Sequence, residues 1–164
     1  MEIIKLSKDY NEQLINLINI TVQNLEKPEW LIALTKEELE KIWTNPKVII
    51  YGAVDNGKLL AISGLFFDES DYLDIMKLLN IENNKVVEIA ECMTLPSARG
   101  NNLMLKINTI LIQEAQKLGF DYIIATAHPD NISSNKSLQK LGMESNVQFL
   151  RYGKYIRNCY MLKI

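Results

Sequence analysis

The chain has 164 residues, of which 48% are hydrophobic and 23% charged, and its 18 basic and 20 acidic residues give a net charge of −2. This composition fits a single domain, residues 1–164, that is long enough to bury a sizeable core. The slightly acidic balance argues against a nucleic-acid partner, no apolar window is long enough to cross a membrane, and a lone histidine excludes a multi-histidine metal site.

The N-terminal stretch and the two cysteines indicate where such a protein would work. The stretch MEIIKLSKDYNEQ has no charged segment followed by an apolar one, which is unlike a signal peptide. Cys92 and Cys159 lie in apolar or strand-like contexts, which is typical of reduced, half-buried thiols. We therefore expect a cytoplasmic protein.

The first half of the chain predicts strands and three helices. The pattern gives a strand at 1–6, helices at 10–25 and from Thr35, a hairpin of strands 48–54 and 58–67, and a short helix at 71–79. Thr35-Lys36-Glu37-Glu38 has the form of a capping box. Asp55-Asn56-Gly57 suits a tight turn, because Asn and Gly tolerate left-handed backbone angles.

The second half predicts an alternation of strands and helices. It gives strands at 85–95 and 121–127, helices at 102–118 and 131–141, and two strands in the tail with a turn near Gly153. A strand–helix–strand unit requires a parallel or locally splayed pairing of its two strands. We therefore expect an α/β fold with a mixed, mostly antiparallel sheet, a central splayed parallel pair, and flanking helices on both faces.

The link LPSARGNNLM, residues 95–104, joins the strand at 85–95 to the long helix. A helix N-terminus carries unpaired N–H groups and partial positive charge, and the small residues with Arg99 give this link the chemistry of an anion cradle for a pyrophosphate. An ordinary turn in which Gly and Asn take left-handed angles explains the same residues. The link is neither a Walker loop nor a dinucleotide fingerprint, because the required glycines and lysine are missing.

The segment TLPSARGNNLM, the long helix and GFDYIIATAHPDNISSNKSLQKLGM together resemble the GNAT superfamily of acyl-CoA-dependent N-acyltransferases. In that family an Arg/Gln-x-x-Gly-x-Gly/Ala loop binds the pyrophosphate of acetyl-CoA, and a later Asn that opens a short helix contacts the pantetheine arm. Arg99 matches the first loop position and Asn131 matches the later Asn. The resemblance implies acetyl-CoA as co-substrate, with no metal.

The resemblance also implies which residues bind the cofactor. They are the strand residues Met93, Thr94 and Leu95 through backbone N–H groups, the loop residues Arg99, Gly100, Asn101, Asn102, Leu103 and Met104, and Asn131 and Ser134 on the later helix. Three residues depart from the family pattern. Asn102 and Met104 replace small loop residues, and Leu138 stands where many members have a tyrosine proposed to protonate the leaving thiolate. Possible substitutes for that tyrosine are Ser137, Tyr152, Tyr155 and Tyr160.

Glu88 and Glu91 are the candidate general bases in the strand at 85–95. Three residues apart in an extended strand, they should point to opposite faces. By the resemblance Glu91 lies closer to the acyl end of the cofactor, so we predict Glu91 as the catalytic base; an edge carboxylate without a catalytic task is the alternative. His128 precedes Pro129-Asp130-Asn131 and more plausibly structures that turn. Neither cysteine has a histidine-activated setting, which favours direct attack over a covalent enzyme intermediate.

These features predict transfer of acetyl from acetyl-CoA to a primary amine of a small molecule or peptide. Aromatic residues that could line the acceptor pocket, or else belong to the core, are Trp30, Trp43, Phe66, Phe67 and Tyr72; acids that could attract a cationic amine are Glu26, Glu29, Asp68, Glu69 and Asp71. The rivals are a non-catalytic acyl-CoA-binding sensor or partner subunit, and an unrelated α/β ligand binder. A homodimer is an open alternative to a monomer.

Overall fold

The structure is a computed structural model that describes residues 1–164, apart from the side chain of Asn146. The strands are β1 (Glu2–Lys5), β2 (Val48–Asp55), β3 (Lys58–Phe66), β4 (Val86–Thr94), β5 (Tyr122–Ala127), β6 (Glu144–Arg151) and β7 (Tyr155–Lys163). The α-helices are α1 (Asn11–Gln23), α2 (Lys36–Lys41), α3 (Leu73–Leu78), α4 (Leu103–Lys117) and α5 (Ile132–Lys140). Each element for which the sequence pattern predicts both ends lies within about three residues of the predicted range; α2, β6 and β7 were predicted without separate bounds.

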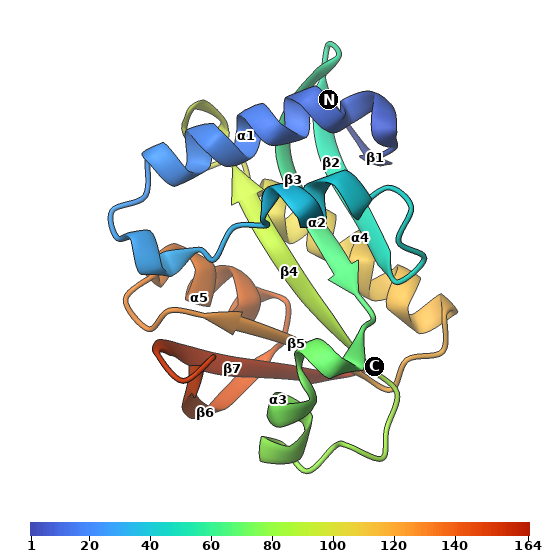
Figure 1. Cartoon of the computed structure of the whole chain (residues 1–164), viewed down its shortest axis with the longest axis vertical. Helices are drawn as coiled ribbons and strands as arrows, with labels where there is room; N and C mark the ends of the chain where they lie inside the picture. The colour runs from blue at the N-terminus through green and yellow to red at the C-terminus, as the bar shows by residue number, and fades with distance from the viewer.

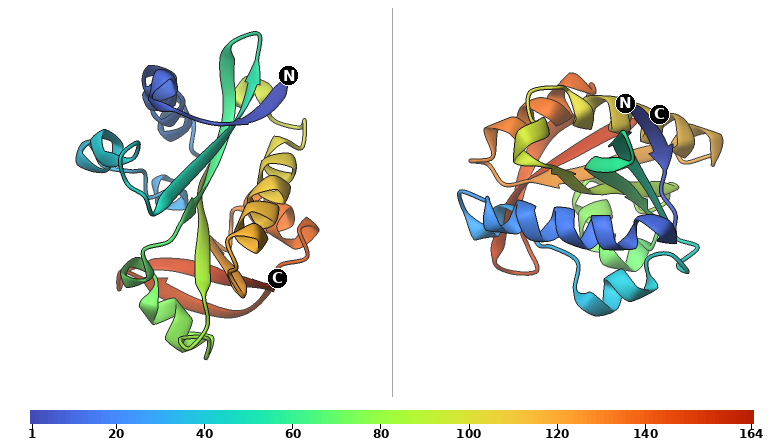
Figure 2. Two further views of the ribbon diagram at one scale, coloured as in Figure 1. Left: turned by 90° about the vertical axis from the view of Figure 1, so that its right-hand side faces the viewer. Right: turned by 90° about the horizontal axis from the view of Figure 1, so that it is seen from above.

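One seven-stranded sheet, in the order β1-β2-β3-β4-β5-β7-β6, organises the chain (Figure 1). β4 and β5 pair in parallel, and every other neighbouring pair is antiparallel. The helices α1 and α2 lie against one face of the sheet and α4 and α5 against the other (Figure 2). The predicted fold class is therefore confirmed, including the central parallel pair that α4 connects.

The pairing between β4 and β5 is short. It joins Val86–Glu88 to Tyr122–Ile124, after which the described ladder between the two strands ends. Beyond that point β4 stays paired with β3, and β5 stays paired with β7. The two strands move apart toward their C-terminal ends, as Figure 1 shows, so the sheet opens at its centre.

Two local signals in the sequence gave the structures that they predict. Thr35 and Glu38 form the capping box of α2, in which the Glu38 N–H donates to Thr35 Oγ1 at 3.3 Å and the Thr35 N–H donates to Glu38 Oε2 at 2.7 Å. The β2–β3 turn has positive φ at both Asn56 (47°) and Gly57 (76°), which matches the twist of the flanking strands.

Two hydrophobic clusters hold the fold together. The larger one lies on both sides of the sheet, with Leu14 and Leu17 of α1 and Ile107 and Leu111 of α4 almost fully buried. The smaller one lies under α3, where the buried Tyr72 hydroxyl donates to the Val86 carbonyl at 2.9 Å. This second cluster fixes the start of β4, the strand that carries both candidate carboxylates. Within the described residues, no helix combines the length and the apolar character needed to cross a bilayer.

Candidate active site

The link between β4 and α4 leaves the first turn of α4 open. Gly100 has φ 82°, and a Cβ there would meet no atom within 4 Å, so the backbone angle rather than space calls for glycine. Asn102, at the N-cap of α4, is also left-handed (φ 55°) and makes no side-chain cap hydrogen bond. The side chain of Asn101 instead donates to the Ala98 carbonyl at 3.0 Å, within the loop.

The uncapped start of α4 fits the pyrophosphate of acetyl-CoA. The helices α2 and α5 have side-chain caps, from Thr35 and Asn131, whereas α4 offers its first N–H groups and the positive end of its dipole without one. The exposed Arg99 adds a cation beside them. Leu103 is buried and Met104 packs against the core. Their side chains therefore point into the protein, and their backbone N–H groups are left at the open start of α4.

The structure corrects part of the predicted donor set on β4. The Leu95 N–H donates to the Leu60 carbonyl of β3 at 2.9 Å and does not face the opening. Successive N–H groups of a strand point to opposite sides. Met93, which pairs with Ile62, therefore points the same way as Leu95, and of the three predicted residues only Thr94 directs its N–H away from β3.

Glu91 sits on a β-bulge, and this overturns the expected opposite orientation of the two carboxylates. Its φ is 56°, and the β3–β4 register shifts between Ile62 and Gly64. A bulge inserts one extra residue and re-aims the side chains that follow. As a result both Glu88 and Glu91 line one cavity of about 610 Å³.

This cavity brings together the candidate base and the start of α5, but none of the predicted cofactor-binding residues between Met93 and Met104 lines it. It is walled by the end of α1, the segment 30–35, α2, β4, β5, the start of α5 and the β6–β7 turn. The predicted residues that line it are Trp30, Phe66, Asp71, Glu88, Glu91, Asn131, Ser134, Leu138 and Tyr152. Other aromatic candidates lie elsewhere: Trp43 donates to Asn11 Oδ1 at 2.8 Å, and Phe67 packs against Phe120 with ring centroids 5.3 Å apart.

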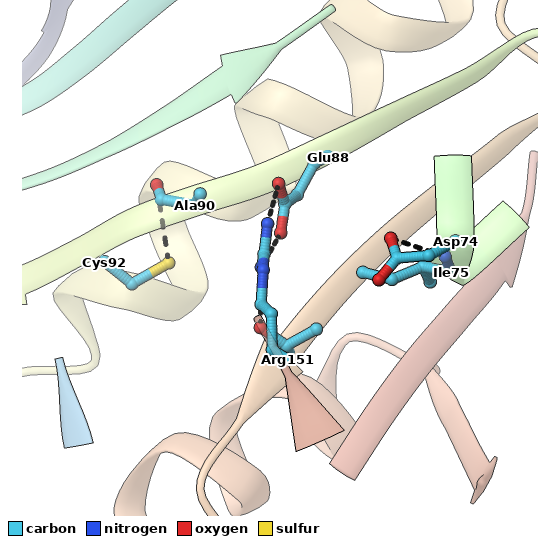
Figure 3. A network of polar contacts seen from close by, with 7 residues as sticks. Asp74, Ile75, Glu88, Ala90, Cys92 and Arg151 are labelled. Carbon is cyan, nitrogen blue, oxygen red and sulfur yellow. Dashed lines mark hydrogen bonds and ion pairs between the residues drawn. The ribbon is translucent and has the colours of Figure 1, made fainter. Parts of the chain in front are cut away.

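Glu88 is held in a buried ion pair with Arg151 (Figure 3). The guanidinium binds both carboxylate oxygens, at 2.5 and 2.9 Å, and also donates to Thr126 Oγ1 at 3.0 Å. The side chains of Glu88 and Arg151 are only 4% and 12% exposed. Because both of its carboxylate oxygens bind Arg151, Glu88 ties β4 to the β6–β7 hairpin, and its carboxylate is already occupied.

Glu91 is in the opposite electrostatic situation. Its Oε2 is buried, and none of the described residues gives it a hydrogen bond. Burial, with smaller contributions from the charges of Glu88 and Glu38, raises the pKa of Glu91 from 4.5 to about 8, while Arg151 opposes the shift. A carboxyl group that titrates near neutral pH is suited to general base catalysis.

A hydrogen-bond network fixes the start of α5. Asn131 Oδ1 accepts from the Ser134 N–H at 3.1 Å, which confirms the N-cap. The Asn135 amide donates to the carbonyls of His128 and Asn131 at 2.8 Å each, and its oxygen accepts from Tyr160 Oη at 2.8 Å. Nothing in the sequence marks Asn135 for this role, since an Asn one turn beyond a cap has the pattern of an ordinary polar residue of a short helix.

His128 and the candidate tyrosines differ in their surroundings. His128 Nδ1 accepts from the Asp130 N–H at 3.1 Å, as a turn-structuring residue would. Leu138 is buried in the cavity wall, and Tyr160 is held by Asn135. Tyr152 lines the cavity and is 61% exposed, whereas Tyr155 and Tyr160 are not among the residues that line it.

Neither cysteine has the environment of a nucleophile. Cys92 is exposed as a residue, although desolvation of its sulfur raises the pKa of the thiol, and burial raises the pKa of Cys159 to about 12. Cys92 Sγ lies 3.1 Å from Ser63 Oγ, and Cys159 belongs to the cluster under α3. In the part of the chain that the structure describes, no group of three or more His, Cys, Asp and Glu residues could hold a metal ion.

Solved structures share this fold across the whole chain at low sequence identity. An N-acetyltransferase from Staphylococcus aureus Mu50 is 18% identical, with a TM-score of 0.75, over 99% of this chain and 97% of that chain. A ribosomal-protein-alanine N-acetyltransferase from Brucella melitensis is 15% identical, with a TM-score of 0.76, over 100% of both chains. The acetyltransferase yncA from Salmonella typhimurium, solved with its cofactor acetyl-CoA, is 17% identical, with a TM-score of 0.75, over 99% of this chain and 92% of that chain.

By sequence, the chain matches a protein family but none of the individual curated proteins. None of the curated proteins compared with the chain matches it. Residues 13–143, which run from α1 through the strands β2 to β5 and the link to α4 to the end of α5, match the Acetyltransferase (GNAT) family. That family uses acetyl-CoA as its co-substrate, in keeping with the open start of α4. The chain belongs to the GNAT acetyltransferase family.

Proposed function

We propose that the chain moves acetyl from acetyl-CoA to a primary amine by direct attack, with Glu91 as the general base. The observation that carries this proposal is the bulge in β4, which turns a buried carboxyl group of pKa about 8 into the cavity where the sheet opens. An amine must lose a proton to attack a thioester. At neutral pH about one molecule in ten has Glu91 ionised and ready to accept that proton.

The cofactor-binding residues act around this base. Arg99 and the first N–H groups of α4 bind the pyrophosphate, and Asn131 and Ser134 hold the pantetheine arm. The oxygen side of Asn131 is occupied by the cap, so its Nδ2 is the group offered to a pantetheine carbonyl. The Thr94 N–H, which points away from β3, stabilises the thioester oxygen as it gains negative charge.

The departing thiolate needs little help. A simple thiol has a pKa of roughly 8.5, so a thiolate leaves readily near neutral pH. Tyr152 supplies a proton where one is needed, in place of the tyrosine that Leu138 replaces. The raised thiol pKa values of Cys92 and Cys159 support transfer without an acyl-cysteine intermediate.

The acceptor is a small molecule or the end of a peptide. The structural relatives are named for different acceptors, among them the alanine of a ribosomal protein, an aminoglycoside and an amino acid, so likeness of fold does not select one. The cavity of about 610 Å³ has room for a small amine beside the acyl group. We place this activity in the cytoplasm, which suits two free cysteines, and in one domain of residues 1–164; a homodimer stays a prediction.

A non-catalytic acyl-CoA-binding sensor is the second candidate, and Leu138 at the tyrosine position favours it. The two are separated by measuring thiol release from acetyl-CoA with polyamines, aminoglycosides, amino acids and peptides. Turnover with at least one amine, reduced roughly 100-fold or more in Glu91→Gln, supports the enzyme. Tight calorimetric binding of CoA without turnover on any amine supports the sensor instead.

A further inference from the structure

The cavity contains a buried cation for which the proposed reaction has no use. Arg157 of β7 is 4% exposed and lines the same cavity as Glu91. Two of its N–H groups donate to backbone carbonyls, those of Ile156 at 2.8 Å and Glu29 at 2.7 Å. Since a guanidinium has five N–H donors, three remain. Among the described residues, no carboxylate forms an ion pair with Arg157, in contrast to the buried Arg151.

A second donor without a partner lies next to it. Trp30 follows Glu29, whose carbonyl binds Arg157, and Trp30 also lines the cavity. Its indole Nε1 is buried, and no acceptor for it exists among the described residues. Leaving a buried indole N–H without an acceptor is costly, and Arg157 has further N–H groups beyond the two that bind carbonyls. Both groups would be satisfied by one anionic acceptor, such as a carboxylate.

The sheet register places this pair opposite Glu91. Glu88 of β4 is aligned with Ile124 of β5, and Ile124 with Met161 of β7. Glu91 lies three residues beyond this row along β4, and Arg157 lies four residues beyond it in the same direction, because β7 runs antiparallel to β5. The two residues are therefore nearly level, two strand spacings apart, which is roughly 10 Å between backbones before the splay is added.

We infer that the acceptor is an amine that also carries a carboxylate, an amino acid or short peptide, bound with its carboxylate at Arg157 and Trp30 and its amine at Glu91. This inference rests on the proposed acetyl transfer and names its substrate class. The charges of the cavity agree with such a zwitterion, since Asp71 lines the same cavity as Arg157. Burial lowers the pKa of Arg157, as expected for a cation without a counter-ion.

The first test compares pairs of ligands that differ only at the carboxylate. Glycine, β-alanine, γ-aminobutyrate, leucine and glycylglycine are each titrated against their carboxamides into the protein saturated with CoA, using calorimetry. At least one acid should bind roughly 10- to 100-fold more tightly than its amide, as a charge-assisted hydrogen bond to a buried guanidinium requires. Equal binding of every acid and its amide would overturn the inference.

The second test uses matched variants of two cationic residues that line the cavity. In Arg157→Gln the preference for the acid should fall to within about threefold, although glutamine can still donate to the Glu29 carbonyl. Lys41→Gln is the control, because Lys41 is 68% exposed and paired with Glu37, and it should keep the preference. In Trp30→Phe the acid should bind roughly 10-fold more weakly and the amide should change far less, from loss of one hydrogen bond to the carboxylate. A preference that survives both Arg157→Gln and Trp30→Phe would refute the site.

Measuring the acetylation of these ligands distinguishes a failure of this inference from a failure of the proposed function. If the acids bind through Arg157 but none is acetylated, acetyl transfer to amines of this class fails, whereas the carboxylate site stands. If amines without a carboxylate are acetylated with equal or higher kcat/KM, the inference fails and acetyl transfer stands. When both hold, Arg157→Gln raises KM for the acid roughly 10- to 100-fold and leaves kcat within about threefold, since Arg157 does not contact the reacting atoms.

Discussion

Replacing Glu91 with glutamine should change how the stability of the protein depends on pH. The unfolded chain releases the Glu91 proton near pH 4.5, whereas the folded chain keeps it up to about pH 8. Between these values the unfolded state binds fewer protons, so the free energy of unfolding of the wild-type protein falls as pH rises. The fall is about 1.4 kcal/mol for each pH unit, and roughly 5 kcal/mol over the whole interval as an upper limit. Glutamine does not titrate, and the variant should lack this contribution.

Urea unfolding of both proteins, at intervals from about pH 4.5 to about pH 8, measures the effect. The quantity of interest is the difference in unfolding free energy between Glu91→Gln and wild type, because all other titrating groups contribute equally to both. This difference should move in favour of the variant as pH rises. Glu82→Gln, at an exposed position, is the matched control and should give a difference that does not change with pH. A constant difference for Glu91→Gln as well would mean that the carboxyl is hydrated, and the reasoning on its pKa would be wrong.

Three other substitutions test separate parts of the structure. Arg99→Glu should weaken CoA binding by roughly 10- to 100-fold in calorimetry, whereas Lys106→Glu, an exposed charge reversal one turn into α4, should weaken it far less; equal losses would refute a specific contact at Arg99. Glu88→Gln should lower the unfolding free energy by roughly 3 kcal/mol, because it leaves the Arg151 guanidinium without its buried counter-charge, and an unchanged urea midpoint would contradict this. Asn102→Gly should leave stability nearly unchanged, whereas Asn102→Val should cost about 1–2 kcal/mol for a branched residue at positive φ; thermal unfolding that ranks Val with Gly would show that the turn is not constrained.

The fold was predictable because its signals are local and repeated. The apolar stripe of α4, the Asn56-Gly57 turn and the capping box at Thr35 each specify one element without reference to the rest of the chain. The order of those elements then limits the sheet, since a strand–helix–strand unit forces β4 and β5 to be parallel. The link at Arg99 to Asn102 was found for the same reason, as its residue types favour left-handed angles next to a helix start.

The site was predictable only in part, because it depends on one irregular residue and on contacts far apart in the sequence. Glutamate at φ 56° has no sequence signal of the kind that Gly or Asn provides, so regular alternation placed Glu88 and Glu91 on opposite faces. The pairing of Glu88 with Arg151 spans 63 positions, and the meeting of Arg157 with the Glu29 carbonyl spans 128. Only the folded sheet brings such partners together.

The short seam between β4 and β5 has a consequence for backbone dynamics. Past Glu88 and Ile124 each strand presents one edge of amides and carbonyls to the gap, which is the kind of edge that recruits another extended chain. A linear molecule with peptide-like amides, such as the pantetheine arm, would dock there as a surrogate strand. Amide hydrogens on the facing edges, that of Thr94 among them, should then exchange more slowly with deuterated solvent once CoA is added, while those at the β2–β3 turn keep their rates.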